Sequence, residues 1–375
     1  MVNSIAGTAC PVMAEAPSDA RAVALSASVA AIEMALQPIW RRAFGRKGGD
    51  SNAHILQMSV GIGRMTRFLR DVSSELGVRI PPTALMRLGT IAALAEAIAR
   101  DEWPAFSSRL LLRDGDRDAA LYIVSGGSGL ILELCDLVSL IAFPGQIWAL
   151  QLPGLDGEAD PLTSIAGMAG HHVEQLIAHH PGGPVHLIGY SLGGIICFEM
   201  ARQLRASGRE IGFIGMIDSV CYEKYWPRSE WLRVSYRRFL RRIAEIRELP
   251  PRAAMARMTT RILSVPPHLG RRFKRGSDAG SFRRSVFYVG GLEPNLQRVR
   301  DGSIVAFEAY RPLRLACRIT LFKSRQGFQH GCNPERIWQS LADHVDVVTT
   351  PGTHISMLRM PCVEDLARQI SSRLN

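Results

Sequence analysis

The sequence predicts an α/β protein in which a small helical bundle precedes a mostly parallel sheet flanked by helices. Two periodicities carry this prediction. Between residues 30 and 98 apolar side chains recur at the spacing of a helix face, whereas after about residue 101 short apolar runs alternate with helical segments. Nearly continuous apolar runs are typical of parallel strands that are buried on both faces of a sheet.

The N-terminal part is expected to hold a mobile segment, 1–29, and a helical domain, 30–100. Residues 1–29 are weakly patterned and rich in alanine. Three amphipathic stripes follow, and Gly77 and the pair Pro81 and Pro82 separate them, since these residues interrupt helices. The stripes consist of Ile39, Trp40, Ala43 and Phe44; of Met65, Phe68, Leu69 and Val72; and of Ile91, Leu94, Ala95 and Ile98.

Residues 101–375 are expected to form the α/β domain. Six strands are predicted, at 120–124, 146–151, 185–188, 212–217, 319–323 and 345–349. Helical segments such as 166–179 and 195–204 lie between most of them. A long basic segment, about 222–300, interrupts this alternation. An insertion at this place would lie over the carboxyl ends of the strands, so we expect it to form a helical lid.

The most informative motif is Gly189-Tyr190-Ser191-Leu192-Gly193. It follows an apolar strand and opens a helical segment, and Gly-x-Ser-x-Gly in that setting is the nucleophile elbow of α/β-hydrolases. The sharp turn lifts the serine hydroxyl above the sheet, and glycines flank it because side chains there would clash across the turn. The motif therefore predicts an α/β-hydrolase fold with Ser191 as its nucleophile.

The base that activates this serine is expected late in the chain. A serine hydroxyl is a poor nucleophile unless a base takes its proton, and the hydrolase order along the chain is serine, acid, histidine. His344 and His354 are the histidines that fall late and near a strand. His354 is preferred, because it follows the strand on a loop from which an imidazole can reach the elbow.

The acid is usually carried after strand six or seven of this fold, which correspond here to 212–217 and 319–323. No carboxylate follows strand 319–323 until Glu335, whereas Asp218 comes directly after strand 212–217. Asp218 is therefore the preferred acid, which would fix the imidazole tautomer and stabilise the imidazolium. Capping the N-terminus of a helix is the alternative role for an aspartate at this position.

Two backbone N–H groups are expected to form an oxyanion hole. One is that of Leu192, directly after the nucleophile. The other should come from the loop after the first predicted strand, Ser125-Gly126-Gly127-Ser128-Gly129. A glycine-rich loop can also cradle a phosphate, but the spacings G-x-G-x-x-G and G-x-x-x-x-G-K-[ST] are absent from this stretch.

The positive charge of the chain is concentrated in the predicted lid. The whole chain has a formal net charge of +11, and residues 222–300 contain 19 Lys and Arg against 6 Asp and Glu. Many of these lie on one predicted helix, at Arg233, Arg237, Arg238, Arg241 and Arg242, opposite Leu232, Tyr236, Phe239, Ile243 and Ile246. A solvated helix face is the favoured interpretation. Docking of an acidic partner comes next, and an anionic membrane or nucleic acid last, so no nucleic-acid partner is expected.

Other residue types restrict the function further. Seven scattered cysteines without a C-x-x-C pair indicate free thiols in a reducing compartment. The sequence has no signal-peptide pattern and no apolar run long enough to span a bilayer, so a cytoplasmic location is expected. His171, His172, His179 and His180 lack a third ligand at metal-site spacing, so we expect no metal there and interpret them as exposed helix residues.

With these residues in place, the chain from about Ala119 to Asn375 resembles the thioesterase domains that release products from nonribosomal peptide and polyketide synthases. The matching segments are 148–158, 187–194, 216–218, 310–312 and 351–357. The resemblance implies a triad of Ser191, Asp218 and His354, with oxyanion donors at Leu192 and Gly127. Thr353 departs from the family, which often has aspartate before the histidine.

The helical domain resembles a peptidyl or acyl carrier domain, most clearly at Glu75-Leu-Gly-Val78 and at 89–95. That family attaches phosphopantetheine to a serine, and the matching position here is Ile62, which cannot carry a phosphodiester. Ser59 lies three residues earlier and lacks the motif. Residues 36–100 are also basic, with 10 basic and 4 acidic side chains, although known carriers tend to be acidic. The resemblance therefore implies a degenerate carrier, with no cofactor on this chain and phosphopantetheine only on the substrate carrier.

The favoured hypothesis is a thioesterase that releases an acyl or peptidyl chain from an acyl or peptidyl carrier protein, through an acyl-enzyme, in secondary-metabolite biosynthesis. Two alternatives stay open. One is a non-catalytic docking module of a synthase, against which an intact triad would argue. The other is a small-molecule carboxylesterase, which would leave the carrier-like domain unexplained.

Overall fold

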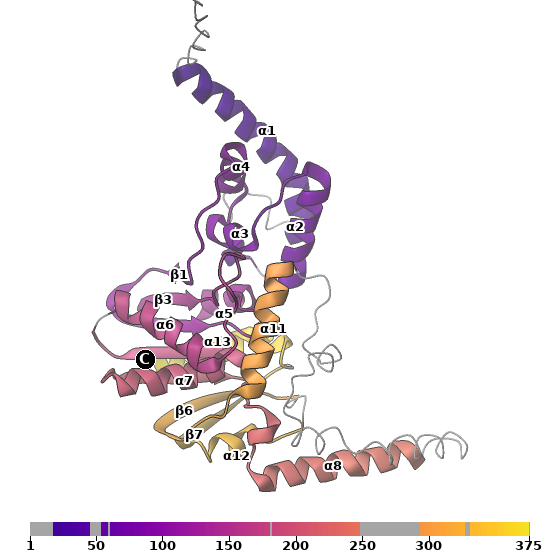
Figure 1. The fold of residues 1–375 in the computed structure, drawn as a ribbon, viewed down its shortest axis with the longest axis vertical. Helices are drawn as coiled ribbons and strands as arrows, with labels where there is room; N and C mark the ends of the chain where they lie inside the picture. Colours follow the sequence, from indigo (N-terminus) through magenta and orange to yellow (C-terminus); the bar gives the residue numbers. More distant parts are fainter. Residues whose placement is uncertain are drawn as a thin grey trace, which may run out of the picture. The chain divides into compact units, whose positions relative to one another are not determined.

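In the computed structural model the chain divides into two compact units (Figure 1). The first takes Met1–Met58 and Arg67–Ala105, and the second takes Ser59–Thr66 and Phe106–Asn375. The structure describes residues 18–45, 54–58, 61–180, 182–247, 293–326 and 331–374. Residues 1–17 of the segment that was expected to be mobile lie outside these ranges, as does Ser59.

The first unit is helical, as the apolar stripes predict. Its helices are α1 (Ser18–Phe44), α2 (Ile62–Leu76), α3 (Pro82–Leu88) and α4 (Ile91–Arg100), with a 3-10 turn at Ile55–Gln57. Helix α1 begins at Ser18, earlier than the predicted start at residue 30. The rings of Trp40, Phe44 and Phe68 pack together with centroids 4.7–5.3 Å apart, so the first two stripes share one core.

The second unit is built on a seven-stranded sheet with the order β1-β3-β2-β4-β5-β6-β7. The strands are β1 (Arg109–Arg113), β2 (Asp116–Val124), β3 (Gly145–Leu150), β4 (Val185–Tyr190), β5 (Ile211–Ile217), β6 (Leu315–Ser324) and β7 (Ala342–Thr350). All neighbouring pairs are parallel except β1 with β3. The carboxyl ends of β2, β4, β5, β6 and β7 therefore meet at one edge of the sheet.

Helices separate most of these strands. They are α5 (Cys135–Leu140), α6 (Ile165–His179), α7 (Leu192–Ala206), α8 (Arg228–Arg247), α11 (Pro294–Ala309), α12 (Pro334–Trp338) and α13 (Cys362–Leu374). Helix α7 packs on β4 and β5 and against α6, and α13 packs on β7 and against α5. The fold is an α/β-hydrolase with a mostly parallel sheet, as the alternation of strands and helices predicts.

Strand β1 was not predicted. Its sequence, Arg-Leu-Leu-Leu-Arg, offers a short apolar run between two charges. It forms an edge of the sheet, and the arginines at its two ends contact neighbouring segments. Arg109 lies over the Trp148 ring, 4.2 Å from the centroid. Arg113 donates to the carbonyls of Ile141 and Phe143 at 2.6 and 3.0 Å. Edge strands need only partial burial, so their apolar signal is weak.

The predicted lid is described in part, over 222–247 and 293–300, and residues 248–292 lie outside the described ranges. Helix α8 carries the predicted arginines. Two of them form ion pairs, Arg233 with Glu230 and Arg238 with Glu223, whereas Arg237 and Arg241 are exposed. The side chains of Leu232, Tyr236 and Phe239 are also exposed, and Val234 packs into an apolar cluster. That cluster consists of Val220, Cys221, Trp226, Val234, Cys332 and Ile337.

Three properties of the described residues bear on other functions. No helix among them combines the length and apolarity of a membrane span. No group of three or more His, Cys, Asp or Glu side chains in the same ranges could hold a metal ion. The six cysteines there are free thiols. The expectation that the four histidines near residue 175 are exposed holds for His179, whereas His171 is half-buried and His172 and His180 are buried.

Candidate active site

Ser191 lies in a sharp turn between β4 and α7. Strand β4 ends at Tyr190 and α7 begins at Leu192, so Ser191 is the single residue between them. Its backbone has φ 54° and ψ −115°, a strained conformation for a residue with a side chain. Its N–H donates to the carbonyl of Ile217 at 2.8 Å, which ties the turn to the end of β5. This is the geometry of a nucleophile elbow.

The two glycines of the motif are required by close approach. A Cβ on Gly189 would lie 2.2 Å from the carbonyl carbon of Gly193, on the other side of the turn. A Cβ on Gly193 would lie 2.4 Å from the carbonyl oxygens of Val124 and Ser125, at the end of β2. Backbone atoms cannot move aside as a flexible side chain can. The motif therefore fixes both the turn and its contact with the loop after β2.

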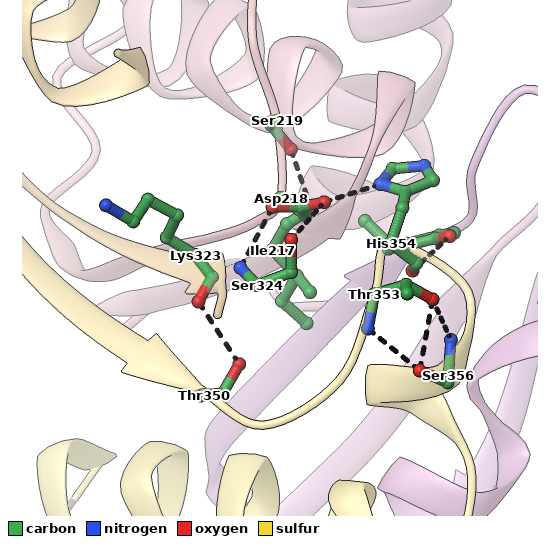
Figure 2. Close-up of polar contacts among 10 residues, drawn as sticks. Ile217, Asp218, Ser219, Lys323, Ser324, Thr350, Thr353, His354 and Ser356 are labelled. Carbon is green, nitrogen blue, oxygen red and sulfur yellow. Dashed lines mark hydrogen bonds and ion pairs between the residues drawn. The ribbon is translucent and has the colours of Figure 1, made fainter. Parts of the chain in front are cut away.

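Asp218 follows β5 and is almost completely buried, with 1% of its surface exposed. Its own N–H donates to the carbonyl of Phe322 at 2.8 Å, so the ladder between β5 and β6 continues into this residue. Its carboxylate accepts hydrogen bonds from the backbone N–H and hydroxyl of Ser324, at 3.1 and 3.2 Å. It also lies 2.8 Å from Nδ1 of His354 (Figure 2). The carboxylate is thus held by β6 and directed at the imidazole.

His354 lies on the loop that follows β7, and only 13% of its side chain is exposed. Thr353 and Ser356 close this loop reciprocally, as Figure 2 shows. The Thr353 N–H donates to Ser356 Oγ at 2.8 Å, and the Ser356 N–H donates to Thr353 Oγ1 at 3.1 Å. The residue that departs from the related family, Thr353, therefore shapes the loop without contacting the acid.

The alternatives for acid and base lie elsewhere. His344 is exposed within β7, where it pairs in register with Arg318 of β6. Glu335 is in the first turn of α12, and its carboxylate accepts from the Gln339 amide at 3.1 Å. His354, in contrast, has its Nδ1 2.8 Å from the Asp218 carboxylate.

The two expected oxyanion donors occupy suitable positions. Leu192 is the first residue of α7, so its N–H has no acceptor within the helix and lies at the positive end of the helix dipole. Gly127 is in the loop after β2, which a hydrogen bond of 3.0 Å from the Gly129 N–H to the Gly126 carbonyl closes. A Cβ added to Gly127 would meet no atom within 4 Å, so the loop borders open space at this residue.

Sequence reasoning missed three residues around this site. Ser324 is the last residue of β6, the strand next to Asp218, and the shared carboxyl edge of parallel strands could have indicated it. Tyr190 is part of the motif itself, and its hydroxyl donates to the carbonyl of His354 at 2.9 Å. Glu133 has no sequence signal. Burial raises the pKa of its carboxyl, although Arg359 and His354 nearby favour the ionised form.

Comparison with known proteins identifies the family. The family model of the thioesterase domain matches residues 136–374, which is more than half of the chain. The chain belongs to the thioesterase-domain family. Thioesterase domains hydrolyse thioesters, and the matched residues include all three of Ser191, Asp218 and His354.

Several relatives of the chain are synthases. It is 23% identical over 313 residues to enterobactin synthase component F of Escherichia coli strain K12, which covers 81% of this chain and 22% of that protein. It is 24% identical over 345 residues to indigoidine synthase of Dickeya dadantii, covering 86% and 22%. The chain thus spans about a fifth of the length of these relatives.

A solved structure supports the same fold. A four-domain nonribosomal peptide synthetase, crystallised with AMP and glycine, has a TM-score of 0.53 and 21% identity to this chain. The superposition covers 91% of this chain and 26% of the synthetase. At this level of identity the similarity establishes the fold alone.

Proposed function

We propose that this protein is a thioesterase that releases an acyl or peptidyl chain from a carrier-protein thioester, with Ser191, Asp218 and His354 as its catalytic triad. The observation that carries the proposal is the 2.8 Å contact between Asp218 and Nδ1 of His354, beside the strained elbow of Ser191. A carboxylate at Nδ1 leaves Nε2 to act as the base. The family supports thioesters as the substrate class.

The first half-reaction forms an acyl-enzyme. The Oγ of Ser191 attacks the thioester carbonyl while Nε2 of His354 takes the hydroxyl proton. The resulting imidazolium lies against the buried carboxylate of Asp218, which stabilises it. The N–H groups of Leu192 and Gly127 would bind the oxyanion of the tetrahedral intermediate. When the C–S bond breaks, His354 returns the proton to the departing thiol.

The second half-reaction releases the chain. Water, or a nucleophile within the acyl chain, attacks the ester carbonyl and gives its proton to Nε2 of His354. The Ser191 oxygen then leaves and recovers that proton. Attack by water gives a free acid, whereas attack by an internal hydroxyl or amine gives a ring. The same residues serve both outcomes, because each needs one base and one oxyanion site.

A carrier protein is the proposed partner. The lid segment 222–300 carries most of the excess positive charge, and Arg237 and Arg241 of α8 are exposed. Acidic carriers would be attracted to such a face. We propose that the helical domain expected at 30–100 is itself a degenerate carrier: α2 begins at Ile62, the residue that matches the attachment serine of the related carriers. The relatives named above are synthases.

The test offers acyl-pantetheine thioesters of several lengths to the full chain, and identifies the products by mass. Loss of thioester with formation of acid or ring, abolished in Ser191→Ala, is the expected result. Folding of the variant is checked by circular dichroism. Turnover that survives Ser191→Ala would reject the triad, and absence of turnover on every thioester would favour a docking module. Faster turnover of simple oxygen esters than of thioesters would favour a carboxylesterase.

A further inference from the structure

Tyr190 contacts the ring and the backbone of His354 at once. It is the last residue of β4, and 5% of its surface is exposed. Its ring stacks on the imidazole with centroids 4.9 Å apart and planes inclined by 27°. Its hydroxyl donates to the His354 carbonyl oxygen at 2.9 Å. One side chain therefore restrains both the plane of the imidazole and the backbone of the loop that carries it.

The other surroundings of Tyr190 include the loop after β2. A Cβ on Gly126 would lie 3.1 Å from Cδ1 of Tyr190 and 3.3 Å from Oε2 of Glu133. The ring thus fits beside Gly126 because that residue has no side chain. Ser191 follows Tyr190 directly in the chain. Tyr190 therefore links the proposed nucleophile to the base, His354, and to the loop of the expected oxyanion donor.

The phenol is kept neutral at this place. Burial raises the pKa of Tyr190, and the carboxylates of Glu133 and Asp218 raise it further. A neutral phenol remains a hydrogen-bond donor to the His354 carbonyl. The π-face of the ring also attracts a cation, and the imidazole becomes a cation when it takes the Ser191 proton. The stack is therefore stronger in the protonated state that forms during the reaction.

We propose that Tyr190 is a positioning residue for the catalytic base: it holds the His354 imidazole in register with Ser191 and stabilises the imidazolium through its ring. This inference rests on the proposed triad. The contact with Asp218 fixes one nitrogen of the imidazole. The stack with Tyr190 acts on the face of the ring and so restrains its tilt.

The experiment measures the rate at which a fluorophosphonate labels Ser191 in the full chain, as a function of pH. Tyr190→Phe keeps the stack and loses the hydroxyl, so labelling should slow about fivefold, which corresponds to about 1 kcal/mol. Tyr190→Leu loses both contacts and should slow labelling about 50-fold. The pH of half-maximal labelling should fall in the leucine variant and stay unchanged in the phenylalanine variant.

Tyr122→Phe is the matched control. Tyr122 is a fully buried tyrosine on the neighbouring strand β2, and the histidine nearest its ring is His180, at 6.4 Å between centroids. It should label at the wild-type rate. If Tyr190→Leu does not fold, the labelling rate of Tyr190→Phe tests the inference: a fivefold slower rate supports it, and a wild-type rate contradicts it.

Three results would overturn the inference. Wild-type labelling rates in both Tyr190 variants would show that the contacts do not matter to the base. A slower rate in Tyr190→Leu with an unmoved pH midpoint would indicate a structural role only. Failure of the wild-type chain to label at Ser191 would reject the proposed function, and the role of Tyr190 with it.

Discussion

His172 makes the second unit sensitive to acid, and the size of the effect can be worked out from its surroundings. The imidazole is fully buried on α6, and neither ring nitrogen has a hydrogen-bond partner within the described part of the chain. Burial, aided by the neighbouring His171, lowers the pKa of His172 from 6.5 to about 3. In the unfolded chain the same imidazole takes up a proton near pH 6.5.

The sign of the pH dependence follows from linkage. Because the unfolded state binds the proton more readily, the contribution of His172 to stability is complete above pH 6.5 and is lost as the pH falls toward 3. Each pH unit in that window costs about 1.4 kcal/mol. Between pH 7 and pH 5 the loss is about 2 kcal/mol, and over the whole window it approaches about 5 kcal/mol. Since domains are stable by about 5–15 kcal/mol, a loss of this size would unfold a domain at the low end of that range and weaken any other.

The test compares the wild-type chain with His172→Leu by hydrogen exchange of peptides from α6 at pH 7 and pH 5, corrected for intrinsic exchange. The leucine variant should lose about 2 kcal/mol less than the wild type over this interval. His179→Gln is the control, because His179 is exposed on the same helix and should leave the pH dependence unchanged. Equal losses in the wild type and His172→Leu would refute the reasoning.

Four further predictions concern the site and its partners. Asp218→Asn should fold and lower kcat by on the order of 10⁴, as mis-set tautomers do in serine proteases; a value within tenfold of wild type would mean that another carboxylate is the acid. Ser324→Ala removes one of the donors to Asp218 and should lower kcat about tenfold with KM unchanged, measured with an acyl-pantetheine thioester. Incubation with coenzyme A and a promiscuous transferase should add no phosphopantetheine mass, and a gain mapped to Ser59 would show a working carrier. Arg237→Glu with Arg241→Glu should raise KM for a carrier-bound substrate and weaken its salt dependence, because exposed charges act over about 8–10 Å; a small free thioester should react as before, and an equal loss on both would indicate damage to the pocket.

The sheet could be predicted where strands are buried on both faces. The runs that became β2, β4 and β5 are nearly continuously apolar, and the structure extends them by a few residues at most. Strand β1 lacked that signal because an edge strand buries less surface. The positions of β6 and β7 were predicted at their carboxyl halves, which are the more buried parts near the site.

The histidines of α6 show an error that periodicity could have prevented. The buried residues of this helix include Ile165, Met168 and Leu176, and position 172 falls on the same face at seven residues from the first and four from the last. His172 is therefore an inward residue, although the polarity of histidine suggested exposure. His179 repeats the same spacing but is exposed, and it is the last residue of the helix, so the spacing of the apolar neighbours predicts the direction of the side chain only within the helix.

The backbone marks the proposed catalytic residues independently of any motif. Asp101, Ser191 and Asp218 are the residues other than glycine with positive φ among those described. Asp101 ends a helix, where a left-handed residue is common. Ser191 and Asp218 instead follow parallel strands, and each is held by an N–H bond to the next strand, to Ile217 and to Phe322. The sheet ladder thus continues into two strained residues and enforces their conformation. Local sequence preference cannot predict such positions, because the strain is maintained by neighbouring strands that lie far away in the chain.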